Sequence, residues 1–148
     1  MNDLRELYQE VIFDHNRHPR NFGKLEGATH EADGYNPLCG DRLHLYLILD
    51  NDKCVERVTF EGEGCAISTA SASLLTEALQ GRSEAEARAL LQDVVAMATG
   101  NVVNTDALGK LSVLSGVQEF PARVKCATLA WHTLESALDQ NDTAVTTE

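Results

Sequence analysis

The sequence predicts an α+β fold, in which an N-terminal helix and a small three-stranded antiparallel sheet precede a set of C-terminal helices packed against the sheet. Three observations support this. Apolar residues recur at helical spacing near the N-terminus, they alternate with polar residues between positions 29 and 62, and helical spacing returns beyond position 65. Strands and helices in separate parts of a chain are typical of this class. We expect one domain at residues 1–138, because 148 residues suffice for a single core.

The first expected element is an amphipathic helix. Its apolar residues recur every three or four positions: Leu4, Leu7, Val11 and Ile12. Asn2 or Asp3 can cap its start, and Pro19 marks its end. His15 and His18 lie three apart near this end. We interpret them as a helix-end pair, with His18 favouring the negative end of the helix dipole, although their roles stay open.

The expected sheet follows a loop. The run from Asp41 to Asp50 alternates polar and apolar side chains, residues 51–52 supply a turn, and residues 53–62 form the second strand of a hairpin. An extended segment at residues 29–35 adds a third strand. Three strands are about the minimum for a stable small sheet that packs on helices.

The remaining elements are expected to be helices. An apolar stripe runs from Ile67 to Ala78, and Gly81 is suited to end that helix. Ser83 and Glu86 form a capping box that opens a helix through Met97. A short helix is expected around residues 106–114, and a last helix starts at Pro121 and runs to about residue 138. Residues 139–148 lack a sustained apolar period, so we expect a flexible tail.

The charge balance favours a protein partner. With 12 Lys and Arg against 23 Asp and Glu, the net charge is −11, which opposes binding to nucleic acids and anionic membranes. We expect neither partner, and we expect a monomer when the protein is alone. The N-terminus lacks the basic start of a signal peptide and no run is long enough to span a membrane. We therefore expect a cytoplasmic protein, whose four cysteines are thiols or metal ligands rather than disulfides.

Three of the cysteines lie at boundaries between expected elements. Cys39 lies in the turn sequence NPLCGD, and Cys65 and Cys126 lie at or within the first turns of expected helices, where the helix dipole favours a thiolate. There is no CxxC pair, so spacing alone is a weak metal signal and each thiol could equally be a small buried hydrophobe. For Cys54, inside an expected strand, we favour that plain interpretation.

The segments around these cysteines resemble a known family. NPLCGD, FEGEGCAISTASASLLTEAL and FPARVKCATLAW are similar to the three ligand segments of the IscU-like (NifU N-terminal domain) iron–sulfur cluster assembly family, and more closely of its SufU branch. The resemblance covers the chain from LYQEVIFDHNRHPRNFG to about Leu138 and implies the SufE/IscU-like fold. Lys125 stands where IscU proteins have a histidine, and the stretch GRSEAEARALLQ corresponds to an additional helical segment of SufU proteins.

The resemblance implies one metal site formed by Cys39, Asp41, Cys65 and Cys126. Three sulfurs and one carboxylate form a tetrahedral set that suits Zn²⁺, whereas iron–sulfur clusters are usually held by cysteine, with histidine as the familiar substitute. It also implies a PLP-dependent cysteine desulfurase of the SufS type as partner, and a SufBCD-type assembly complex as a candidate downstream partner. Cys39, in the expected mobile turn, is our candidate for the catalytic thiol that accepts persulfide sulfur.

Two other functions remain open. The same four residues could hold a transient [2Fe-2S] cluster, or iron, on a scaffold that transfers the cluster to other proteins. Alternatively, a purely structural zinc domain could serve as a binding module. Enzyme activity is therefore uncertain and extends at most to a zinc-dependent sulfurtransferase acting with the desulfurase. Arg123 and Lys125 could steer an anionic persulfide or offset the charge of the site, and Lys125 could equally be plain solvated surface. His132 has no obvious partner in the sequence.

Overall fold

The computed structural model describes residues 3–101, 105–117, 120–140 and 144–146, and the side chains from residue 9 onward except those at 105–107. Within these residues the chain forms, in order, α1 (Asp3–Arg17), β1 (His30–Asn36), β2 (Asp41–Leu49), β3 (Val55–Glu63), α2 (Ala66–Leu79), α3 (Glu84–Ala98), the 3₁₀ element η1 (Thr105–Val117), α4 (Pro121–Leu138) and β4 (Val145–Thr146). The predicted α+β class is confirmed.

The sheet has four strands in the order β3-β2-β1-β4. β2 pairs antiparallel with β1 and β3, as predicted, whereas β4 pairs parallel with β1 through Gly34–Val145 and Tyr35–Thr146. The predicted count of three strands is therefore wrong by one, because a two-residue strand is too short to show any alternation. β4 lies within the segment predicted as a tail, and the division into domain 1–138 and flexible tail 139–148 stays a prediction.

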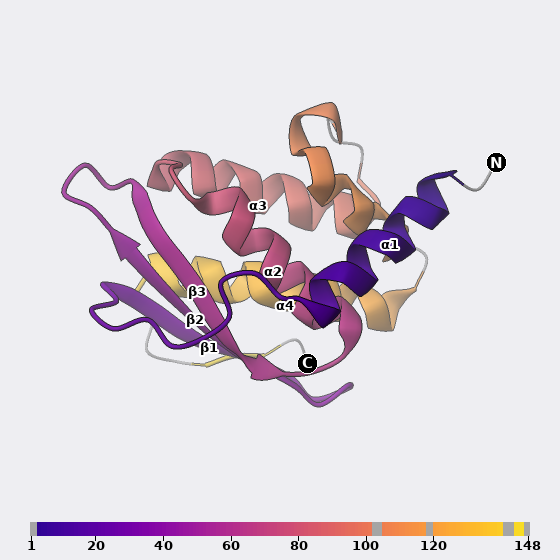
Figure 1. Ribbon diagram of the computed structural model, residues 1–148, viewed down its shortest axis with the longest axis horizontal. Helices are drawn as coiled ribbons and strands as arrows, with labels where there is room; N and C mark the ends of the chain where they lie inside the picture. Colours follow the sequence, from indigo (N-terminus) through magenta and orange to yellow (C-terminus); the bar gives the residue numbers. More distant parts are fainter. Residues whose placement is uncertain (1–2, 102–104, 118–119, 141–143, 147–148) are drawn as a thin grey trace.

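One face of the sheet supports the core. Leu43, Leu45 and Leu47 of β2 point inward and are at most 6% exposed, and Leu45 pairs with the buried Phe60 of β3. Helix α4 covers β1 and β2, and α2 covers β3, so two helices share the inner face (Figure 1). Helices α1 and α3 pack outside these two, α1 against α2 and α3 against α4. Alternation along the strands thus produces a layered α+β structure.

Local sequence signals explain where the helices begin and end. The capping box of α3 is confirmed, since the Ser83 hydroxyl accepts from the Glu86 N–H and the Glu86 carboxylate accepts from the Ser83 N–H. Pro121 opens α4, whose Trp131 is fully buried. The helix predicted at residues 106–114 is instead 3₁₀ structure over Thr105–Val117, interrupted at Gly109, where the backbone is not helical. The predicted cap Asn2 lies outside the described residues.

Two residue predictions need correction. Cys54 lies just before β3 in the β2–β3 hairpin rather than inside a strand, and it forms an isolated bridge with Ser83. His15 lies in the last turn of α1, as predicted, but unlike the exposed His18 it is not a surface residue. It is fully buried, and its Nδ1 lies 2.7 Å from the Ser73 hydroxyl of α2. Its apolar neighbours on α1 turn this face of the helix toward α2, so His15 helps to attach the two helices.

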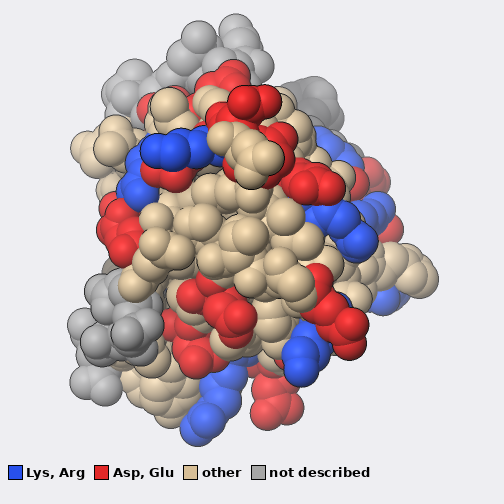
Figure 2. Space-filling view, turned by 90° about the vertical axis from the view of Figure 1, so that its left-hand side faces the viewer, with Lys and Arg blue, Asp and Glu red and all other residues tan. Residues whose placement is uncertain are grey.

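The surface carries charges of both signs. Figure 2 shows the end of the molecule with the β2–β3 hairpin, where acidic and basic side chains are interspersed around an uncharged central area. Among the helices that the structure describes, none is long and apolar enough to cross a membrane.

Candidate metal centre

Three segments that are distant in the sequence meet at one end of the sheet. Cys39 lies in the four-residue turn 37–40 between β1 and β2, where the last turn residue, Gly40, has a φ of 73°. Cys65 is the N-cap of α2, and its sulfur accepts a hydrogen bond from the Ser68 N–H at 3.4 Å. Cys126 follows five residues after Pro121 on α4, with 2% exposure. The turn and the two helix starts therefore present all three thiols to a common volume.

Asp41 completes this group. Donor atoms of Cys39, Asp41 and Cys126 all lie within 4.8 Å of one another. The Cys126 and Cys39 sulfurs are 3.3 Å apart. Cys65 lies beside these three, with its sulfur 3.9 Å from Oδ2 of Asp41. All four predicted site residues are thus brought together, although Cys65 is less closely placed than the others.

The carboxylate of Asp41 is fully buried and held on both oxygens. Oδ1 accepts from the Cys65 N–H at 2.7 Å, and Oδ2 accepts from the Asn36 side-chain amide at 3.0 Å. Gly64 makes this position possible, because a Cβ at residue 64 would lie only 2.5 Å from Oδ1. The glycine before Cys65 therefore matters for close approach rather than for a turn alone.

The thiols differ in their acidity. A hydrogen bond from Cys126, together with the Ser68 N–H at the start of α2, outweighs burial and lowers the pKa of Cys65 to about 7. The pKa of Cys126 is raised, because its thiol donates to Cys65 and is buried. The lowered pKa of Cys65 agrees with the prediction that a helix start favours a thiolate, whereas hydrogen bonding and burial act in the opposite direction on Cys126. Cys126 lies beyond the first turn of α4, where the dipole effect has faded.

The donor set fits a tetrahedral metal ion. In a zinc site with bonds of about 2.3 Å to sulfur, neighbouring sulfurs are about 3.8 Å apart. The Cys39 and Cys126 sulfurs are 3.3 Å apart, which is about 0.5 Å less than that value. A zinc-bound sulfur and carboxylate oxygen would be about 3.6 Å apart, and the Cys65 sulfur lies 3.9 Å from Oδ2 of Asp41. Small side-chain movements would therefore suffice for coordination. Among the residues that the structure describes, Cys39, Asp41 and Cys126 are the only such cluster of metal-type donors.

The remaining residues singled out in the sequence lie around this centre or away from it. Cys54 is half-buried in the hairpin, and its sulfur is 4.0 Å from the carbonyl of Asp52. The Arg123 guanidinium stacks on Phe120, 4.5 Å from the ring centre. Lys125 and His132 line a hollow along α4 that β4 borders. The roles of Arg123 and Lys125 near the site stay predictions.

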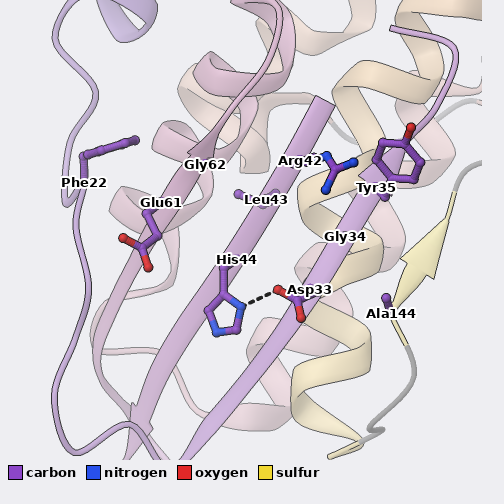
Figure 3. A pocket seen from close by; sticks show the side chains of 10 residues that line it. All are labelled: Phe22, Asp33, Gly34, Tyr35, Arg42, Leu43, His44, Glu61, Gly62 and Ala144. Atoms are coloured by element: carbon purple, nitrogen blue, oxygen red, sulfur yellow. Dashed lines mark hydrogen bonds and ion pairs between the residues drawn. The ribbon is translucent and has the colours of Figure 1, made fainter. Parts of the chain in front are cut away.

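A second hollow lies on the outer face of the sheet. Figure 3 shows its lining, in which His44 of β2 points toward Asp33 of β1, and Tyr35 and Arg42 lie at one end. His44 also contacts Glu31, at 2.8 Å. Burial alone would lower the pKa of His44, but hydrogen bonds to these two carboxylates outweigh it and raise the pKa. Asp33 and Glu31 thus pair with His44, and they do not form a cluster of metal-type donors with one another.

Sequence reasoning missed Asn36. Asn36 precedes a proline, which is a common way to start a turn, so its amide attracted no attention. Its side chain is fully buried and donates to both Asp41 and Cys126. An asparagine five positions before an aspartate carries no signal by itself; only the pairing of Asn36 with Asp41 in the sheet register brings them together.

Comparison with known proteins identifies the family. Residues 7–142 match the family described as NifU-like N terminal domain. The chain belongs to this family. The family predicted from the three cysteine segments is thereby confirmed.

Relatives within the NifU-like family carry two kinds of name. The chain is 43% identical over 141 residues to the zinc-dependent sulfurtransferase SufU of Bacillus subtilis, covering 95% of each chain. It is 40% identical to the iron–sulfur cluster assembly scaffold protein IscU of Streptococcus pyogenes, covering 97% of this chain and 90% of the other. A crystal structure from Fervidobacterium islandicum is described as a candidate cluster assembly scaffold for the SUF system. It superposes with a TM-score of 0.84 at 36% identity, and the match covers 90% of this chain and 98% of the other.

Proposed function

We propose that this protein is a zinc-dependent sulfur acceptor in iron–sulfur cluster assembly. In this role Cys39 takes persulfide sulfur from a PLP-dependent cysteine desulfurase of the SufS type. The protein then passes the sulfur to the cluster assembly machinery, for which a SufBCD-type complex is the candidate. Cys39, Asp41, Cys65 and Cys126 would hold the ion, and zinc bound there would keep the sulfurs deprotonated at neutral pH.

The observation that carries this proposal is the unequal exposure of the four residues. Cys39 is exposed in its turn, whereas Asp41 and Cys126 are at most 2% exposed and Cys65 is half-buried. A large donor such as a desulfurase therefore reaches the exposed Cys39 sulfur more readily than the half-buried Cys65 sulfur. The adjacent Leu38 is also exposed, at 61%, so a partner surface can approach the turn directly.

The chemistry at Cys39 is a thiol exchange that needs no oxidant. The Cys39 thiolate attacks the outer sulfur of the donor persulfide, a new S–S bond forms, and the donor S–S bond breaks. The donor cysteine leaves as a thiolate and Cys39 becomes the persulfide. Electrons balance because one S–S bond replaces another. The buried residues of the site hold their positions through hydrogen bonds while the exposed turn reacts.

The [2Fe-2S] scaffold is the second candidate function, because several relatives of similar identity are named as scaffold proteins. The two functions differ in what the purified protein contains. Anaerobic purification followed by zinc and iron analysis, and assay with the desulfurase, cysteine and a reductant, separates them. We expect tightly bound zinc and increased sulfide release; a stable visible cluster without increased release would favour the scaffold.

Two variants test the residue roles. Cys39→Ser should abolish sulfur acceptance, because a serine hydroxyl does not attack a persulfide. Asp41→Ala should lower both the zinc content and the stimulation of the desulfurase. If both quantities match the parent protein, Asp41 is not part of the site.

A further inference from the structure

We propose that Asn36 is a positioning residue, which holds the Asp41 carboxylate and the Cys126 sulfur in place for metal binding. This role rests on the proposed zinc site. Asn36 is the last residue of β1 and is fully buried. Its side-chain nitrogen donates to Oδ2 of Asp41 at 3.0 Å and to the sulfur of Cys126 at 3.4 Å. One amide group therefore contacts two of the four candidate ligands.

Both contacts come from one side-chain nitrogen. An asparagine NH₂ group carries two hydrogens, and each can serve one acceptor. The two acceptors belong to separate elements, since Asp41 opens β2 and Cys126 lies on α4, 90 positions after Asn36. Asn36 thus sets the distance between a carboxylate oxygen and a sulfur that no nearby backbone connection fixes.

The contact with Asp41 also shapes what the carboxylate can do. The Cys65 N–H occupies Oδ1, and Oδ2 lies 3.9 Å from the Cys65 sulfur. Oδ2 can accept from Asn36 and still offer a lone pair to a metal ion. If Oδ2 leaves an ion during ligand exchange, the amide still holds it in place. Asn36 therefore keeps the Asp41 carboxylate in position to coordinate the ion again. A surface aspartate without such a hydrogen bond would not be held in this way.

A side chain that orients metal ligands without touching the metal typically changes metal affinity by about 10- to 100-fold. Asn36→Asp is the sharpest variant, because it preserves shape, removes both N–H donors and places a negative charge next to Oδ2. Asn21→Asp is the matched control. The Asn21 amide donates to the Thr76 hydroxyl of α2 rather than to the cysteine cluster.

The experiment measures zinc affinity by competition with a chromophoric chelator, and it records the visible spectrum of the cobalt(II)-substituted protein, which reports ligand geometry. We expect Asn36→Asp to weaken zinc binding about 10- to 100-fold and to displace the cobalt bands, while Asn21→Asp matches the parent in both. An Asn36→Asp protein with native circular dichroism, parental zinc affinity and a parental cobalt spectrum would overturn the inference. A parent protein that binds neither metal would instead overturn the proposed function.

A measurement on the unchanged protein covers the case in which Asn36→Asp does not fold. The two side-chain amide protons of Asn36 should shift in NMR spectra when zinc is added, because both of their acceptors change their electron distribution. The amide protons of Asn21 should stay in place. Unshifted Asn36 protons in a zinc-loaded protein would contradict the proposed contacts.

Discussion

Replacing Gly64 by alanine tests the position of the Asp41 carboxylate while leaving all four candidate ligands intact. The added Cβ would lie 2.5 Å from Oδ1 of Asp41, whereas ordinary contacts begin at 3.4 Å. The carboxylate must therefore retreat by about 0.9 Å, the difference between these distances. Metal sites tolerate deviations of only about 0.2 Å in ligand distance. We expect the loss of one ligand and a zinc dissociation constant at least about 100-fold higher, beyond the usual effect of a supporting residue.

The assay is chelator competition on Gly64→Ala and on a control, Gly81→Ala. Gly81 has a φ of 84° with no atom within 4 Å of an added Cβ. Its substitution should destabilise the fold by about 1–2 kcal/mol through backbone strain and leave zinc affinity unchanged. Gly64→Ala should show a much larger loss of zinc affinity for a comparable loss of stability. A natively folded Gly64→Ala protein with parental zinc affinity would refute this account of the carboxylate.

Three further predictions concern residues outside the cluster. Cys54→Ser should change neither zinc content nor sulfur acceptance, and zinc loss in elemental analysis would require a new ligand assignment. The pKa of His44 is raised in the folded protein, so its contribution to stability is present below about pH 6.5 and is lost as the pH rises through the pKa of the folded state. His44→Gln should therefore lower the urea midpoint more at pH 5.5 than at pH 8.5. An equal decrease at both pH values would contradict this. Ser71→Ala should lower the free energy of unfolding by about 1–3 kcal/mol, because the buried Trp131 indole loses its acceptor. Ser136→Ala is its control, since that buried hydroxyl has no hydrogen-bond partner among the described residues.

Local signals in the sequence identified most of the fold. The capping box at Ser83 and the proline at the start of α4 act within a few residues, so they could be recognised without tertiary structure. β4 could not be recognised, because its two residues form a strand only through pairing with Gly34 and Tyr35. The 3₁₀ form of η1 and its interruption at Gly109 were likewise not predicted.

The candidate site likewise combines features that have a sequence signal with features that depend on tertiary packing. The flanking motifs brought Cys39, Asp41, Cys65 and Cys126 into one hypothesis, and the structure places them together. Their unequal burial, the amide bridge from Asn36 and the raised pKa of Cys126 all arise from packing between distant segments. Such features have no local pattern, so sequence reasoning could not supply them.

The meeting of three distant segments at the cysteine cluster would give a zinc ion bound there a thermodynamic role. Cys39 and Cys126 are 87 positions apart, so an ion shared by them would act as a removable cross-link across most of the fold. Because only the folded chain presents all four ligands, zinc at about a thousand times its dissociation constant would add about 4 kcal/mol to the free energy of unfolding. A partner that drew Cys39 away from such an ion would release part of that stabilisation. Sulfur transfer and a decrease in the free energy of unfolding would then coincide, and the protein would be least stable when it accepts the sulfur.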